Sequence, residues 1–243
     1  MVKYEKKTEI VMDYKKNINY FENKKLLLYG GAGLLVLGLV LMFGPFGDRD
    51  NYMILYILSV LSLIAGGVAF TLAVTTRSTD KKIDEDLAEE YKYFDEEKLA
   101  KFDLYERQLT YIKSVEIEDY QYYDGSMIRR DRMSHYRTDL YGKTHIYFTE
   151  NTLCVVNKNV SLIKDEKTDH DIEVPYKDIK KAFLTDKTVS YTLGKKAVTV
   201  TVPMLHIEYE AGGEDVYQVK PDLETDTAVE DINRLAEKAK KNG

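Results

Sequence analysis

Two long stretches without charge lie near the N-terminus and constrain the fold most. No Asp, Glu, Lys or Arg occurs at the 22 positions between Lys25 and Asp48, or at the 26 positions between Asp50 and Arg77. Each stretch exceeds the roughly 20 residues that a helix needs to cross a hydrocarbon core of about 30 Å. Buried helices of soluble proteins seldom lack every charge for so long. The sequence therefore predicts two transmembrane helices, at residues 26–47 and 51–76, arranged as a hairpin.

The basic residues around these stretches predict their orientation. A cleaved signal peptide fits poorly, because the first apolar run is too long and a second span follows it. Lysines precede the first span, and Arg77, Lys81 and Lys82 follow the second, whereas the connecting loop has only Arg49. Short translocated loops carry few basic residues. We therefore expect a multi-pass protein of the cell (inner) membrane with both termini in the cytoplasm.

Two further segments flank the spans. Residues 1–25 are polar and basic, which fits either a short amphipathic helix at the membrane surface or a solvated tail. Residues 77–103 are expected to form a cytoplasmic connecting helix that leads to a soluble domain at residues 104–243. Its apolar residues have helical spacing and are interpreted as a packing face: Ile83, Leu87, Tyr91 and Phe94.

Small residues recur at four-residue intervals in the second span. They are Ser62, Ala65, Gly66, Ala69 and Ala73. Small side chains let helices approach closely in lipid, so this face is predicted to pack on the first span or, alternatively, on a second copy. Neither span contains an ionisable Asp, Glu, Lys, Arg or His, the residues that usually mark ion pathways. Transport by these two helices alone is therefore not expected.

The soluble part has the alternating pattern of short antiparallel strands. Apolar residues alternate with polar ones at 115–117, 198–202 and 205–209, and glycine-containing turns occur at 124–125, 193–194 and 212–213. A C-terminal helix follows, with a capping box predicted at Thr227 and Glu230 and an apolar face that includes Ile232 and Leu235. The fold class expected is a membrane α-hairpin plus an α+β soluble domain.

This order of elements resembles the pleckstrin-homology-like (PH-like) fold of bacterial membrane proteins. Residues 174–180, VPYKDIK, resemble the apolar-Pro-Tyr-x-Asp-Ile segment of those domains, and residues 146–153 resemble the strand-turn-strand before it. A two-helix hairpin followed by such a domain is similar to the YcxB-like arrangement. The resemblance implies an antiparallel sandwich or barrel of about seven strands capped by a helix, a binding or scaffolding role, and no catalytic residues. The charged insert at residues 126–143 departs from this pattern.

One cluster of basic residues stands out in the acidic soluble part. Residues 75–243 carry 27 Lys and Arg against 35 Asp and Glu, so nucleic acid is a poor partner. Tethered beside a bilayer, the cluster is a candidate site for anionic lipid. The alternative is a solvated hairpin partly neutralised by Asp131 and Asp139. The candidate residues are Arg129, Arg130, Arg132, Arg137 and Lys143.

No motif in the sequence predicts a metal site or a cofactor. The four histidines are scattered, and the segment at residues 169–171 is interpreted as a polar loop. The glycines at 30–33 lie inside a predicted span and lack a phosphate-binding context. Cys154 lies in an apolar run and is expected to be a core residue.

These observations leave three hypotheses about function. The leading one is a non-enzymatic integral membrane protein whose PH-like domain binds a protein partner or scaffolds an oligomer at the inner leaflet. The second is sensing of anionic lipid by the arginine hairpin. The third is an unrecognised membrane-anchored enzyme that uses dispersed carboxylates such as Glu208 and Glu210, which strand alternation also explains as a solvated face. No small-molecule substrate is evident.

Overall fold

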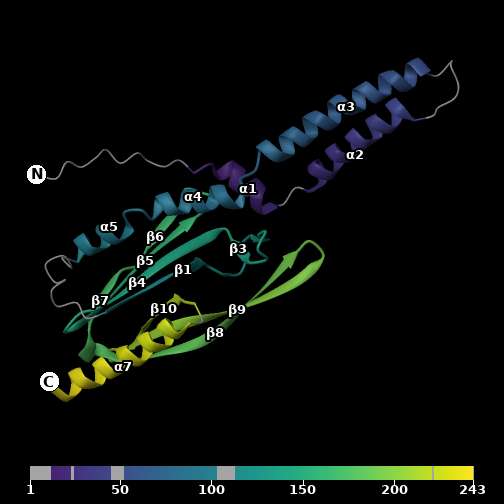
Figure 1. Cartoon of the computed structure of the whole chain (residues 1–243). Helices are drawn as coiled ribbons and strands as arrows, with labels where there is room; N and C mark the ends of the chain where they lie inside the picture. The colour runs from purple at the N-terminus through teal and green to yellow at the C-terminus, as the bar shows by residue number, and fades with distance from the viewer. Residues whose placement is uncertain (1–11, 23–24, 45–51, 103–112, 221, 243) are drawn as a thin grey trace, which may run out of the picture. The chain divides into compact units, whose positions relative to one another are not determined.

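The computed structural model describes residues 12–22, 25–44, 52–102, 113–220 and 222–242 (Figure 1). They form two compact units, a helical unit that ends at Asp84 and a β-rich unit that begins at Glu85. Residues 1–11, 45–51 and 103–112 lie outside the described residues, together with positions 23–24, 221 and 243.

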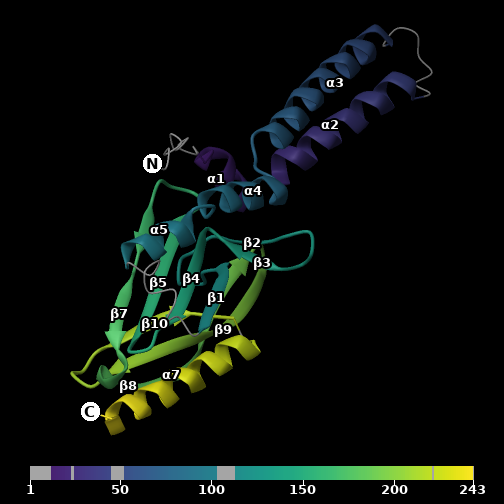
Figure 2. The ribbon, with the colours of Figure 1, turned by 60° about the vertical axis from the view of Figure 1, so that its left-hand side comes forward.

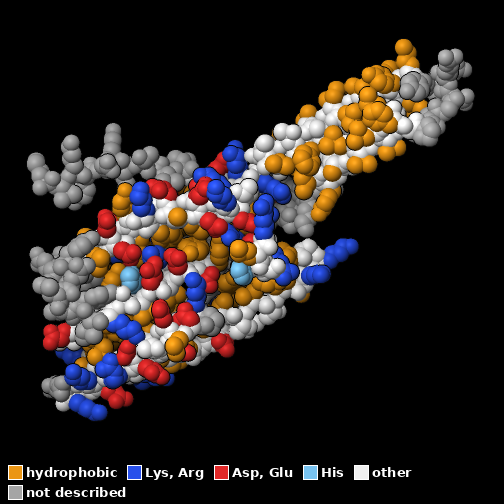
Figure 3. Space-filling model, in the orientation of Figure 1, with side chains coloured by type: hydrophobic (Ala, Val, Ile, Leu, Met, Phe, Trp, Pro, Cys, Tyr) orange, Lys and Arg blue, Asp and Glu red, His pale blue; other side chains and the backbone are white. Residues whose placement is uncertain are grey.

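The helical unit contains the two apolar stretches as helices α2 (Lys25–Phe43) and α3 (Tyr52–Thr75). The helical stretch that begins at Met53 is long and apolar enough to cross a membrane, and α3 itself spans about 36 Å. The shorter α2 passes the same test only together with α1 (Tyr14–Glu22). Figure 3 shows hydrophobic side chains gathered over α2 and α3. One membrane-spanning helix is thus supported by length and composition, and the second crossing stays a prediction.

Small residues bring α2 and α3 into close contact. A Cβ atom on Gly66 would lie 2.8 Å from the backbone nitrogen of Leu35 and 2.9 Å from the carbonyl oxygen of Gly31. Ser62 Oγ donates a hydrogen bond of 2.8 Å to the Leu34 carbonyl. Of the other predicted packing residues, Ala73 is buried, Ala69 is half-buried and Ala65 is exposed.

Helix α1 is bound at the C-terminal end of α3. Asn19 Nδ2 donates to the carbonyl of Thr76, which follows α3, at 2.8 Å. Tyr20 Oη donates to Asp80 Oδ1 at 2.7 Å. The solvated-tail alternative therefore does not apply to residues 14–22. Placement of α1 at a membrane surface stays a prediction.

The connecting segment is two helices rather than the single helix predicted. Helix α4 (Asp80–Glu90) and helix α5 (Phe94–Lys101) are separated at Tyr91. The Tyr91 side chain turns inward and its hydroxyl donates to the carbonyls of Tyr141 and Lys158 at 3.1 and 3.0 Å. The predicted apolar stripe, including Tyr91 and Phe94, is buried.

The β-rich unit contains antiparallel ladders, which confirms the α+β class (Figure 2). The first sheet has the order β1-β4-β5-β6, and β7 also pairs with β5. Its strands are β1 (Lys113–Tyr120), β4 (Leu140–Phe148), β5 (Thr152–Ser161), β6 (Lys167–Asp169) and β7 (Ile172–Pro175). A 3-10 turn at Tyr176–Asp178 follows β7 and leads into the second sheet.

The second sheet has the order β10-β9-β8, and a separate hairpin joins β2 to β3. These strands are β8 (Ile179–Leu193), β9 (Lys196–Tyr209), β10 (Glu214–Gln218), β2 (Ile128–Arg130) and β3 (Tyr136–Thr138). Strands β8 and β9, of 15 and 14 residues, are longer than the short strands predicted. The ladders of the described strands do not close into a barrel, so the seven-strand PH-like arrangement stays a prediction.

One hydrophobic core joins both sheets to helix α7 (Leu223–Asn242). Ile232 of α7 is fully buried and Leu235 packs against the same cluster. The helix begins earlier than predicted, because Asp222 Oδ1 accepts a hydrogen bond of 2.8 Å from the backbone nitrogen of Thr225. The capping box predicted at Thr227 is therefore wrong. Cys154 is fully buried in β5, as predicted.

Candidate functional surfaces

The arginine cluster lies on the β2–β3 hairpin, which has an exposed tip. Arg129 pairs with Arg137 across the hairpin, and the turn includes Ser134 at a φ of 74°. Arg130 is exposed and its Nε donates to the Ser134 carbonyl at 3.2 Å. Arg132 is also exposed, and Met133 beside it is 79% exposed. The tip therefore presents a large apolar side chain between basic ones.

Two members of the predicted site do not belong to this exposed tip. Arg137 is turned inward: its Nε donates to Asp131 Oδ2 at 3.2 Å and its Nη1 to the Tyr120 hydroxyl at 3.0 Å. Asp131 thus neutralises Arg137, as the solvated-hairpin alternative predicted. The partners of the Asp139 carboxylate lie outside the arginine cluster: Oδ1 accepts hydrogen bonds from the backbone nitrogen of Met127 at 3.1 Å and from the Tyr123 hydroxyl at 3.2 Å.

Lys143 lies elsewhere, on β4, and is buried. Its Nζ is 2.6 Å from Glu116 Oε1 and 3.5 Å from Asp95 Oδ2. Burial opposes the charge of the ammonium group, but these two carboxylates outweigh it and raise the pKa of Lys143. Lys143 is a structural cation inside the β-rich unit, so its assignment to a lipid-binding patch is corrected.

The structure adds lysines that the sequence did not connect with the arginines. Ile128 of β2 packs with Val189 and Tyr191 of β8 in a second small core, and Leu193 joins it at the end of β8. The β8–β9 turn then exposes Lys195 and Lys196. The two hairpins lie side by side in both ribbon views (Figures 1 and 2). The basic end is defined here as Arg129, Arg130, Arg132, Lys195 and Lys196.

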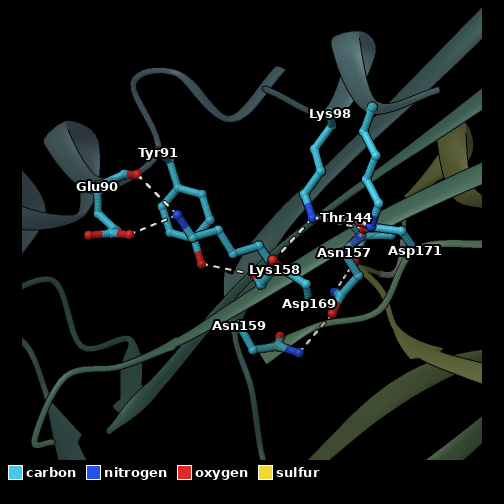
Figure 4. Close-up of polar contacts among 10 residues, drawn as sticks. Glu90, Tyr91, Lys98, Thr144, Asn157, Lys158, Asn159, Asp169 and Asp171 are labelled. Carbon is cyan, nitrogen blue, oxygen red and sulfur yellow. Dashed lines mark hydrogen bonds and ion pairs between the residues drawn. The ribbon is translucent and has the colours of Figure 1, made fainter. Parts of the chain in front are cut away.

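A second set of charged residues joins α4 and α5 to the first sheet (Figure 4). Glu90 Oε1 lies 2.7 Å from Lys158 Nζ and 2.8 Å from Lys167 Nζ. Lys98 Nζ contacts Asp169 at 3.1 Å and Asp171 at 2.8 Å, and Lys101 Nζ contacts Asp171 at 2.7 Å. The polar loop predicted at 169–171 is therefore an anchor for α5.

The electrostatics of this network favour the charged forms. Burial alone would raise the pKa of the Asp171 carboxyl, but hydrogen bonds from Lys101 and Lys98 outweigh it and hold the pKa below its ordinary value. The pKa of Glu90 is likewise lowered, because hydrogen bonds from Lys158 and Lys167 outweigh the effect of burial. Helical periodicity marks the apolar face of these helices but gives no signal for ion pairs with distant strands.

A shallow acidic groove of about 660 Å³ lies between β7 and the β9–β10 turn. Ile172 and Val174 of β7 line one side, and Tyr209 and Asp215 line the other. Asp215 is held by the Tyr209 hydroxyl, which donates to Oδ2, and by His170 Nε2 at 2.6 Å from Oδ1. Further lining residues are Glu173, Asp178, Glu210, Ala211 and Gly212.

Glu208 and Glu210, the carboxylates of the enzyme hypothesis, have separate basic partners. Glu208 Oε2 lies 3.2 Å from Lys180 Nζ, and Glu210 Oε1 contacts Lys240 Nζ at 2.5 Å. The described residues contain no group of three or more His, Cys, Asp or Glu able to hold a metal ion.

One hydroxyl–imidazole–carboxylate series occurs on the second sheet. Thr185 Oγ1 lies 2.7 Å from His206 Nε2, and His206 Nδ1 lies 2.9 Å from Glu214 Oε2. This order is that of a nucleophile, a base and an orienting acid. His206 lies on β9, which pairs with β8 on one side and with β10 on the other. The backbone N–H groups of β9 therefore form ladder hydrogen bonds rather than an oxyanion hole. Cross-strand hydrogen bonding accounts for the series.

Comparisons with known proteins give no assignment: no family model, no curated protein and no solved structure matches the chain.

Proposed function

We propose that this chain is a non-enzymatic, multi-pass integral membrane protein with both termini in the cytoplasm. Its β-rich unit, a PH-like module, binds a protein partner or organises an oligomer at the inner leaflet. The observation that carries the proposal is the exposed apolar surface of α2 and α3, followed at once by a segment that is bound to the β-rich unit.

The exposed surface favours a bilayer. Large apolar side chains on both helices are left uncovered, among them Val36 on α2 and Met53, Ile64 and Val68 on α3. In water each exposed apolar Å² costs about 25 cal/mol relative to burial. Contiguous apolar surface of this extent is typical of membrane or interaction sites. The backbone of both helices is satisfied internally, as lipid requires.

The chain connection tethers the β-rich unit to the span. Helix α3 ends at Thr75, and the last residue of α4, Glu90, is already paired with Lys158 and Lys167 of the first sheet. Tyr91 and Phe94 are buried immediately after it. Only residues 76–79 lie between α3 and α4, so a partner bound to the β-rich unit is tethered to the anchor by a short length of chain.

The acidic groove offers a concave surface for a partner. Its apolar floor residues, Ile172 and Val174, lie on β7, which pairs on one side only among the described strands. An extended segment of a partner gains backbone hydrogen bonds along such an edge. The carboxylates of Glu173, Asp178 and Asp215 favour a segment with basic side chains.

A photo-crosslinking residue placed in the full-length chain tests this proposal in intact membranes. Position 211, exposed in the groove, should give a crosslinked adduct, and position 188, exposed on β8, should not. Mass spectrometry of the adduct distinguishes a partner protein from a second copy. Absence of an adduct from position 211, or equal adducts from both positions, contradicts partner binding at the groove.

A further inference from the structure

We infer that the basic end of the β-rich unit binds the anionic surface of the bilayer to which its own chain is anchored, and that Met133 enters the lipid interface there. This inference rests on the proposed membrane anchorage and is independent of protein binding at the groove. It replaces the predicted arginine patch by a two-hairpin surface without Arg137 and Lys143.

The β2–β3 and β8–β9 hairpins act as one surface. Ile128 of β2 is buried with Val189 and Tyr191 of β8, and Tyr136 of β3 packs against the same cluster. The Tyr122 hydroxyl donates to the Tyr136 carbonyl at 2.7 Å, which holds β3. Because the bases of both hairpins share this core, their tips are fixed relative to one another. Both tips are basic.

The side chains at the β2–β3 tip suit a lipid interface. Met133 is 79% exposed, next to Arg132 and near Arg130, which is also exposed. Burial of a methionine side chain in an interface is favourable, and guanidinium groups bind phosphate oxygens in bidentate fashion. Apolar residues flanked by basic ones are the pattern of surface-binding membrane elements. In water, exposure of the apolar Met133 side chain is unfavourable.

Positive charge is concentrated at the basic end. The soluble part is acidic overall, so attraction to an anionic surface requires basic residues that are segregated at one place. The acid in the β2–β3 turn, Asp131, has a side chain that is 4% exposed, and its Oδ2 accepts a hydrogen bond from Arg137. It therefore does not offset the exposed tip. Lys195 and Lys196 add two exposed cations on the neighbouring tip.

The membrane anchor makes a weak attraction to lipid sufficient. Electrostatic attraction by a few basic residues is weak for a free domain, but a covalent anchor keeps the local concentration of lipid headgroups high. A modest attraction is then sufficient to hold the basic end against the bilayer. The acidic remainder of the domain disfavours nucleic acid as the ligand.

A fluorescent reporter in the full-length chain tests this inference. Cys154 is fully buried and is retained, and Met133→Cys provides an accessible thiol for an environment-sensitive dye. The protein is inserted singly into nanodiscs of phosphatidylcholine, or of phosphatidylcholine mixed with an equal amount of phosphatidylglycerol. We expect a blue shift and a several-fold rise in emission only with phosphatidylglycerol, reversed by high salt. The same dye on Leu223→Cys, exposed at the start of α7, should not respond.

Charge reversal supplies the matched control. Lys195→Glu with Lys196→Glu should weaken or remove the response of the dye at position 133, whereas Lys238→Glu with Lys241→Glu changes net charge equally and should preserve it. An identical dye spectrum in both lipids, or an unaltered response after reversal at 195 and 196, overturns the inference. Co-elution of protein and nanodisc reports anchorage separately: co-elution without a dye response contradicts only the lipid contact, and loss of co-elution contradicts the anchorage as well.

Discussion

Lys98 Nζ lies 2.9 Å from Oδ1 and 2.8 Å from Oδ2 of Asp171, although 73 positions separate the two residues in sequence. Both side chains are buried, with exposures of 7% and 1%. Asp171 also accepts a hydrogen bond from the backbone nitrogen of Asn157 at 3.1 Å. This ion pair fixes α5 on the first sheet, so α5 is part of the β-rich unit.

Removal of the Lys98 charge should destabilise the β-rich unit. Lys98→Met keeps the length of the side chain but leaves the buried Asp171 carboxylate with less compensation, which costs about 3 kcal/mol of unfolding free energy. Lys101→Met, at a more exposed partner of the same carboxylate, should cost less than about 1 kcal/mol. Denaturant titration of the full chain in detergent, followed by tyrosine fluorescence, measures both. Equal effects of the two changes would show that the buried pair has no special role.

Acid should weaken the same connection. The pKa of Asp171 is lower in the folded protein than its ordinary value, so the unfolded chain binds the proton more readily. The stabilisation from Asp171 is therefore complete above the unfolded pKa and is lost as pH falls from about 5 through the lower folded value. Asp171→Asn should be less stable than the unmodified chain at pH 7, with the difference shrinking toward pH 3. A difference that stays constant over this range contradicts the linkage.

Close approach of α2 and α3 should depend on Gly66. A Cβ at this position meets backbone atoms of Leu35 and Gly31, so Gly66→Ala should separate the helices and destabilise the pair by about 1 to 3 kcal/mol. The neighbouring Gly67 has nothing within 4 Å of its Cβ position, which makes Gly67→Ala the matched control. Spin labels at the exposed positions 43 and 53 report the distance between the helices in lipid. A Gly66→Ala distance distribution that matches that of Gly67→Ala would refute this packing.

The elements that sequence analysis predicted well are those with a strong local signal. The charge-free runs gave α2 and α3, and the glycine turns at 125, 194 and 212–213 all have positive φ values in the structure. Burial of Cys154 followed from its apolar neighbours. Hydrophobic periodicity and the residue types of turns are local properties, so they can be recognised in a single sequence.

The misplaced residues are those whose position depends on partners far along the chain. Lys143 is near the arginines in sequence, yet alternation along β4 directs its side chain toward Glu116 on β1. Lys195 lies far from Arg130 in sequence, and only the small core around Ile128 unites their hairpins. Asp222 caps α7 in place of Thr227. Both residues have a side-chain oxygen suitable for an N-cap, and the sequence alone does not show at which of them the helix begins.

Thiol labelling in intact cells tests the membrane topology most directly. A single reactive cysteine is placed either at position 48, between the two apolar stretches, or at position 195, on the exposed β8–β9 turn, with Cys154 replaced by Ser. A membrane-impermeant maleimide should label position 48 and should reach position 195 only after the cells are permeabilised. Labelling of position 195 but not position 48 in intact cells would contradict a cytoplasmic β-rich unit carried by a two-helix membrane anchor.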